Sequence, residues 1–281
     1  MSRIRVLEVG GIGTPVFIFP GIGGELSDFA SLAKRLGRER AIYGVRLAGM
    51  QGECEPVREM QKLASIHAAD LCLIQPRGPY ILLGYSFGGS LALEVARELQ
   101  SLGRRVGLLI LADAPAPGYP ELPPAHVRAL AHLTRLLQLD TRARLDYFKS
   151  KVARRVHRVR RLLGMSEPVV AAQSPVHDEP PIDRRVLNAL DEAYLNYRPT
   201  PLAVDALVLS CDVPPDLPGF KFDDPLLGWG PVLLGHIIQC QTPGTHFDLF
   251  SPSNLEVLAQ HVRAGIAHAE RAKYTHVYAQ P

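Results

Sequence analysis

The chain has 281 residues, 47% of them hydrophobic, which suits one α/β domain with an insertion or two small domains. Its net charge of +3 is too small to indicate nucleic-acid binding, and its four scattered cysteines argue against a zinc site or a disulfide framework. There is no signal-peptide pattern and no run of 18 apolar residues. We therefore expect a cytoplasmic protein with no metal site, no membrane span and no nucleic-acid partner.

Strand and helix patterns alternate through the first half of the chain. Apolar runs typical of strands lie at residues 15–20, 41–47, 80–85 and 106–113. Helical spacing of apolar residues lies between them, at residues 26–37, 57–75 and 87–102. This alternation predicts a mostly parallel sheet flanked by helices, the α/β fold class. The strand runs are continuously apolar, as expected for strands that are covered on both faces.

The pattern changes after residue 113. Residues 114–124 are rich in proline, and the chain then has helical spacing to about residue 164. Strand patterns return at residues 205–211 and 235–240, before a closing helix at residues 254–272. We predict one domain over residues 1–281, with a helical lid insertion at about residues 114–195. Such a lid would cover the carboxyl edge of the sheet, where open α/β sheets bind ligands.

Ser86 is the candidate nucleophile. Residues 84–88 read G-Y-S-F-G and match the pattern G-x-S-x-G, which arises by chance in roughly one chain of this composition in ten. Here a strand pattern precedes the motif, and an amphipathic helix with Leu91, Val95 and Leu99 on one face follows it. Strand, sharp turn and helix form the context of a nucleophile elbow, so we favour this interpretation over a glycine-rich turn without chemistry.

A serine nucleophile needs a base and an acid, which in this type of sheet follow it in the order acid, then histidine. Of the ten histidines, His246 lies in a Pro-Gly loop just after the last strand pattern, where it could reach over the nucleophile. His67, by contrast, lies in a helical pattern that we expect at the surface. Asp113 and Asp212 each follow a strand, and local features leave both open as the acid or as a turn cap.

Backbone N–H groups should form the oxyanion hole. One belongs to Phe87, directly after the nucleophile, and the other to Ile22 in the loop at residues 19–26. The glycines of this loop let its backbone approach a substrate. The loop does not fit a dinucleotide-binding G-x-G-x-x-G motif, because Leu26 occupies the last glycine position.

From about residue 15 to residue 262, the chain resembles the thioesterase domains that end polyketide synthases and non-ribosomal peptide synthetases. The resemblance rests on five blocks in order: VFIFPGIGGELSDFASLAKRLG, IYGVRLAG, GPYILLGYSFGGSLALEVARELQSLGRRVGLLILADAPAP, YRPTPLAVDALVLS and GWGPVLLGHIIQCQTPGTHFDLF. It implies an α/β-hydrolase fold with His246 in the PGTHF motif as the base. It implies Asp113 as the acid, with Asp212 as the runner-up, and Ile22 and Phe87 as the oxyanion donors.

The resemblance also implies an activity: release of an acyl, polyketide or peptidyl chain from a phosphopantetheine thioester through an acyl-serine intermediate, by hydrolysis or cyclisation. The partner would be an acyl or peptidyl carrier protein domain that brings the phosphopantetheine, with no cofactor bound to the chain itself. The alternatives are a general carboxylesterase or lipase, or an acyltransferase, of the same fold. A non-catalytic binding module is disfavoured because serine, aspartate and histidine are all present.

A basic segment within the predicted lid is a candidate docking surface for the carrier. Residues 142–161 contain nine lysines or arginines and a single acid. Carrier domains are commonly acidic, which makes Arg154, Arg155 and Arg158 possible docking residues. The alternative is an ordinary solvated face of a lid helix.

Overall fold

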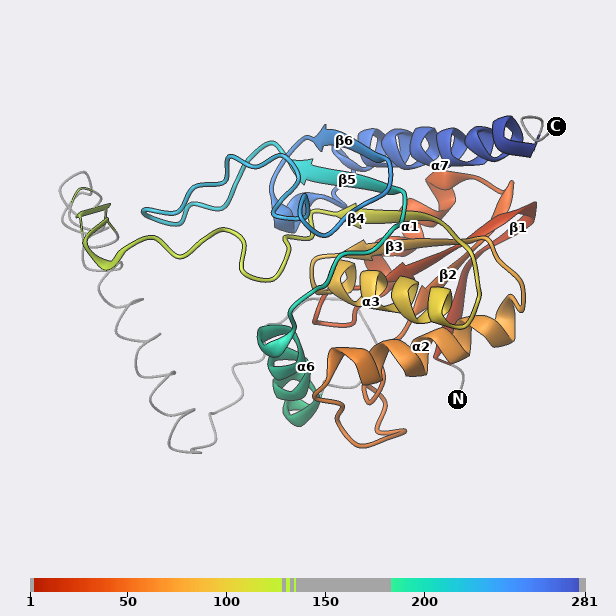
Figure 1. Cartoon of the computed structure of the whole chain (residues 1–281), viewed down its shortest axis with the longest axis horizontal. Helices are drawn as coiled ribbons and strands as arrows, with labels where there is room; N and C mark the ends of the chain where they lie inside the picture. The colour runs from red at the N-terminus through yellow and green to blue at the C-terminus, as the bar shows by residue number, and fades with distance from the viewer. Residues whose placement is uncertain (1–2, 128–129, 132–133, 135–182, 278–281) are drawn as a thin grey trace. The chain divides into compact units, whose positions relative to one another are not determined.

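The computed structural model describes residues 3–127, 130–131, 134 and 183–277 (Figure 1). The chain divides into two compact units. One comprises residues 1–121, 182–215 and 221–281 and holds the sheet with the helices named below. The other comprises residues 122–181 and 216–220, most of which lie outside the described residues. The single domain and the extent of its lid therefore stay predictions.

The first unit is built on a six-stranded sheet in the order β2-β1-β3-β4-β5-β6. The strands are β1 (Ile4–Phe19), β2 (Arg40–Val45), β3 (Tyr80–Tyr85), β4 (Val106–Ala112), β5 (Ala206–Cys211) and β6 (Ile237–Thr242). From β1 to β6 each neighbouring pair is parallel. This confirms the mostly parallel sheet that the alternating patterns predict.

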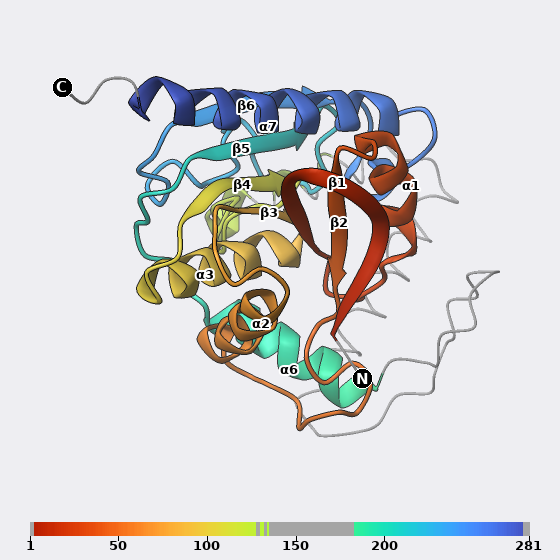
Figure 2. The ribbon, with the colours of Figure 1, turned by 90° about the vertical axis from the view of Figure 1, so that its right-hand side faces the viewer.

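Strand β1 joins a strand-like segment at residues 4–9 to the apolar run at residues 15–20 in one continuous strand. Its first half pairs with β2 in the antiparallel sense, as in Ile4↔Val45 and Val6↔Tyr43. Figure 2 shows a bend in β1. Beyond it, the second half of β1 pairs with β2 in the parallel sense, from Val16↔Ile42 to Ile18↔Gly44. Strand β2 is thus enclosed by the two halves of β1.

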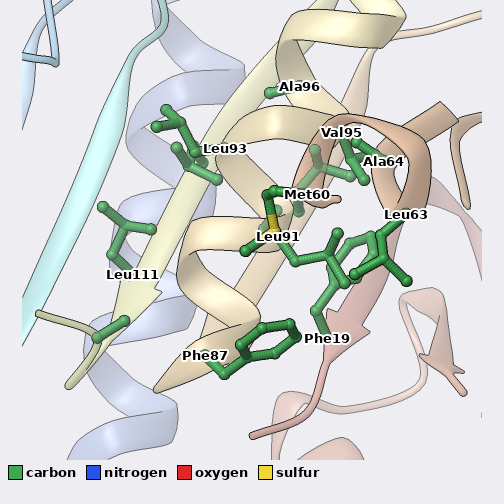
Figure 3. Close-up of a cluster of buried hydrophobic side chains, with 14 of the residues drawn as sticks. Phe19, Met60, Leu63, Ala64, Phe87, Leu91, Leu93, Val95, Ala96 and Leu111 are labelled. Atoms are coloured by element: carbon green, nitrogen blue, oxygen red, sulfur yellow. The ribbon is translucent and has the colours of Figure 1, made fainter. Parts of the chain in front are cut away.

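Helices cover both faces of the sheet (Figure 2). One face packs against α1 (Ser27–Leu36) and α7 (Leu255–Val277), and α2 (Met60–Ile74) and α3 (Phe87–Ser101) lie on the side of the other face. Helix α6 (Arg184–Asn196) contributes side chains to the same core as α2 and α3. Strand β3 shows why its sequence is continuously apolar. Ile81 and Leu83 belong to the core on the α1 and α7 side, whereas Tyr80 and Leu82 belong to the core that Figure 3 shows around α2 and α3.

The parallel register brings three strand ends to one edge of the sheet. Tyr85 at the end of β3 pairs with Ala112 at the end of β4, and Ala112 pairs with Leu209 near the end of β5. The residues that follow these strands therefore gather at the carboxyl edge. In the part of the chain that the structure describes, no helix is long and apolar enough to cross a membrane.

Candidate active site

Ser86 stands in the sharp turn between β3 and α3. Its backbone has φ 54° and ψ −123°, a conformation that residues with a side chain rarely adopt. The Ser86 N–H donates to the Ala112 carbonyl at 3.3 Å, and the Ser86 carbonyl accepts from the Gly89 N–H at 3.0 Å. These bonds hold the turn against β4 and begin α3. The local geometry is that of the predicted nucleophile elbow.

The two glycines of the motif are required by close backbone approach. A Cβ on Gly84 would lie 2.2 Å from the Gly88 carbonyl oxygen. A Cβ on Gly88 would lie 2.2 Å from the Phe19 carbonyl oxygen at the end of β1. Neither approach is possible for a residue with a side chain, since the obstacle is backbone in both cases. The pattern G-x-S-x-G is thus a packing requirement of this turn.

Asp113 follows β4 and also has an unusual backbone, with φ 42°. Its Oδ1 accepts a hydrogen bond from the Cys211 N–H at 3.0 Å, and its Oδ2 lies 2.6 Å from Nδ1 of His246. A carboxylate can only accept, so this contact favours the tautomer of the neutral imidazole that carries its proton on Nδ1 and leaves Nε2 as an acceptor. Among the described residues that are not glycine, only Ser86, Asp113 and Leu227 have positive φ, and such outliers are typical of active sites.

His246 begins a single 3₁₀ turn, η1 (His246–Asp248), just after β6. A capping box fixes this turn: the Thr245 side chain accepts from the Asp248 N–H, and the Asp248 carboxylate accepts from the Thr245 N–H. The imidazole is mostly covered, with 23% of the side chain exposed. The fixed turn therefore presents the imidazole ring to Asp113 at the carboxyl edge of the sheet.

Asp212 meets the main chain of the same loop. Its Oδ1 accepts from the Gly244 N–H at 2.8 Å, and its own N–H donates to the Thr242 carbonyl at 2.9 Å. These contacts fasten the loop that leads to His246 onto the end of β5. Of the two candidate acids, Asp113 is the one that the structure brings to the imidazole.

The two predicted oxyanion donors lie next to the elbow. A Cβ on Gly21 would lie 3.7 Å from Cβ of Ser86, so the loop that carries Ile22 passes beside the serine. Phe87 is the first residue of α3, where backbone N–H groups have no partner within the helix. Both N–H groups thus come from segments that adjoin Ser86.

Two residues were not assigned correctly from sequence. Tyr85 was only the variable residue of the motif, yet its hydroxyl donates to the His246 carbonyl at 2.7 Å and its ring stacks on the imidazole. Adjacency to Ser86 was the only signal. The surface location expected for His67 is wrong. This side chain is fully buried, accepts from the Ala48 N–H at 3.4 Å and has its pKa lowered by burial.

Burial raises the pKa of the Cys211 thiol to about 12, and the negative charge of Asp113 adds to the shift. This shift favours the neutral thiol over the thiolate at physiological pH. No group of three or more potential metal ligands occurs among the described residues. Arg154, Arg155 and Arg158 lie outside the described residues.

A mostly parallel sheet with a serine elbow, an aspartate and a late histidine at its carboxyl edge defines the α/β-hydrolase class. Residues 14–266 match the family model described as thioesterase domain, and the chain belongs to that family.

Similar proteins agree with this membership. The RedJ thioesterase from the prodiginine biosynthetic pathway of Streptomyces coelicolor is 25% identical, with a TM-score of 0.60 and coverage of 90% of both chains. Indigoidine synthase of Dickeya dadantii is 37% identical over 133 residues, which are 46% of this chain and 8% of that protein. "Inactive atromentin synthetase invA6" of Paxillus involutus is 41% identical over 104 residues, 36% of this chain and 11% of that protein. The matched segments thus make up about a tenth of each of these two longer proteins.

Proposed function

We propose that this chain is a serine thioesterase that releases an acyl, polyketide or peptidyl chain from the phosphopantetheine thioester of a carrier protein. The single observation that carries the proposal is the 2.6 Å contact between Asp113 and the His246 imidazole, at the edge where Ser86 stands in the elbow. In this proposal Ser86 is the nucleophile, His246 the base and Asp113 the acid.

The proposed reaction has two steps. His246 Nε2 takes the proton of Ser86 as its oxygen attacks the thioester carbonyl, while Asp113 holds the imidazole in the required tautomer. The N–H groups of Ile22 and Phe87 stabilise the oxyanion, at about 3 kcal/mol for each donor. The pantetheine thiol leaves with the proton from His246. His246 then takes a proton from water, or from a hydroxyl or amine of the acyl chain itself, as that group attacks the ester carbonyl. The bond between the acyl group and the Ser86 oxygen breaks, His246 returns the proton to Ser86, and the product is the free acid or the cyclised chain.

The proposed partner is an acyl or peptidyl carrier protein domain in the cytoplasm. Two relatives named above are synthetases and a third is a biosynthetic thioesterase, which supports a substrate delivered on a carrier. The phosphopantetheine then belongs to the partner, and this chain binds no cofactor of its own. Arg154, Arg155 and Arg158 would assist docking through charge, from a helical lid at about residues 114–195 of the single domain.

Replacement of the nucleophile tests the proposal. We expect Ser86→Ala to lower the turnover of an acyl N-acetylcysteamine thioester at least about 10³-fold and to abolish labelling by a fluorophosphonate, with an unchanged melting temperature. Ser101→Ala, at the exposed far end of α3, is the matched control and should behave as wild type. Peptide mass spectrometry should locate the label on Ser86.

If pure Ser86→Ala keeps a turnover rate close to that of wild type, or if the label lies on another residue, the assignment of Ser86 as the nucleophile is rejected. Comparison of the thioester with an oxygen ester of the same acyl chain distinguishes the thioesterase proposal from the alternative of a general esterase. Faster acylation by the oxygen ester at matched concentrations would favour the esterase.

A further inference from the structure

Tyr85 joins the candidate nucleophile to the candidate base. It precedes Ser86 in the chain, and its backbone pairs with Ala112, the neighbour of Asp113. Its side chain reaches His246, which is 161 residues away in sequence. Tyr85 is therefore bonded to Ser86 in the chain, pairs with the residue before Asp113, and contacts His246 through its side chain.

Two separate interactions connect Tyr85 with His246. The phenol hydroxyl donates a hydrogen bond to the His246 carbonyl oxygen at 2.7 Å, which fixes the main chain that carries the imidazole. The two rings are stacked, with centroids 4.8 Å apart and planes 19° from parallel. One face of the imidazole thus lies on the π-face of the tyrosine. Hydroxyl and ring can be removed separately by substitution.

Tyr85 itself is held rigidly. Phe250 packs edge-on against it with ring centroids 4.9 Å apart, and Phe29 of α1 does the same at 6.3 Å. Burial raises the pKa of the Tyr85 phenol, and the nearby charge of Asp113 adds to this, so the hydroxyl stays protonated and remains a donor. A side chain fixed in this way can define the plane of the ring that it touches.

The stacked geometry has a consequence for the reaction. The imidazole becomes a cation when it takes the serine proton, and a cation over an aromatic face within about 6 Å is stabilised by the ring quadrupole. Among the described residues, a second ring contact of the imidazole is with Phe247, whose ring lies at 85° to it and is exposed. Tyr85 thus supplies the parallel face on which the charge would develop.

We infer that Tyr85 is a positioning residue for His246: its hydroxyl holds the main chain of the base, and its ring holds the imidazole plane and stabilises the imidazolium. The inference deepens the proposed function and rests on it. The titratable groups that face His246 or the Tyr85 ring come from α1, η1 and the ends of β4 and β5, and are Asp28, Asp113, Cys211, Asp212 and Asp248. All of them are kept in the variants below.

Matched variants separate the two contacts. Tyr85→Phe removes the hydroxyl and keeps the ring, whereas Tyr85→Leu removes both, with Tyr85→Met as a second non-aromatic variant if Tyr85→Leu does not fold. The measurement is kcat/KM for an acyl N-acetylcysteamine thioester from pH 5 to 10, together with the rate of fluorophosphonate labelling.

Tyr85→Leu and Tyr85→Met, which lack the aromatic face, should have a kcat/KM roughly three- to thirtyfold lower than that of Tyr85→Phe. Because the ring favours the cation, its loss should also move the acid limb of the pH–rate profile to lower pH, by roughly half a unit. Tyr85→Phe should keep the wild-type position of that limb. A purely structural role would lower the rate without moving the limb, so an unmoved limb in the non-aromatic variants overturns the inference.

An NMR readout keeps the two proposals distinguishable. The His246 ring protons, assigned by comparison with His246→Gln, should shift upfield under the tyrosine ring in wild type and Tyr85→Phe, and lose this shift in Tyr85→Leu. If wild type neither turns over the thioester nor takes the label, the proposed function fails. If wild type is active but the ring-proton shifts are the same in Tyr85→Leu, the inference about Tyr85 fails alone.

Discussion

The ends of β4 and β5 make an instructive pair. The two strands are parallel neighbours, and each is followed at once by an aspartate, Asp113 or Asp212. Both carboxylates serve the loop of His246. Asp113 meets its imidazole, whereas Asp212 meets the Gly244 N–H two residues earlier. Aspartates at equivalent strand ends thus make different contacts: one with a side chain of the loop, and the other with its main chain.

Replacement of each aspartate by asparagine should give the largest contrast. Asp113→Asn should lower kcat by up to about 10⁴-fold, because an amide can hold the imidazole in the wrong tautomer. Asp212→Asn should stay within about threefold of wild type, because the amide oxygen still accepts from the Gly244 N–H. Thioester kinetics on both proteins, at matched melting temperatures, are the measurement. A damaging Asp212→Asn beside a mild Asp113→Asn would reverse the two roles.

Asp212→Ala should lower kcat by an amount between the effects of Asp113→Asn and Asp212→Asn. The Gly244 N–H loses its side-chain acceptor, which we expect to destabilise the fold by about 1 kcal/mol and to loosen the loop before His246. We expect a roughly fivefold fall in kcat, which is the factor that about 1 kcal/mol represents if the whole destabilisation acts on the loop before His246. Kinetics and thermal unfolding, with Asp212→Asn as the control that keeps the acceptor, measure both effects. Equal behaviour of the alanine and asparagine variants would show that the Gly244 contact is unimportant.

The smallest effect concerns Cys211, which lies between Asp113 and Asp212 in this edge. With a pKa of about 12, roughly one thiol in 10⁴ is ionised at pH 8. Iodoacetamide at pH 8 should therefore label the exposed Cys54 first and leave Cys211 and the activity intact. Labelling of Cys211 should quicken about tenfold for each unit of added pH. Peptide mass spectrometry, with Cys54→Ser as the control, checks this, and equal labelling of both thiols would contradict it.

The local sequence predicted the structure best where contacts between residues close in the chain determine it. Gly84 and Gly88 are required by contacts within the elbow and with the end of β1, so the motif and its flanking patterns predicted the turn. The continuous apolar runs predicted the sheet, because both faces of its central strands are covered.

Local sequence could not decide between Asp113 and Asp212. Both follow strands, and only the resemblance favoured the residue that the structure brings to the imidazole. The contact of Tyr85 with His246 was also beyond prediction, since it joins distant segments and depends on where a single 3₁₀ turn lies. The burial of His67 depends likewise on how α2 packs against the sheet, which its helical spacing did not determine.

The backbone of Ser86 has a consequence for the history of such a chain. A glycine would adopt φ 54° and ψ −123° without the strain of a side chain, which is of order 1–3 kcal/mol for a residue in such a region. At this one turn, the most stable sequence and the chemically competent sequence are therefore different. If Ser86 is the nucleophile, as proposed, its hydroxyl is retained at a backbone conformation that glycine adopts with less strain, and a lineage released from that need would be expected to drift to glycine here.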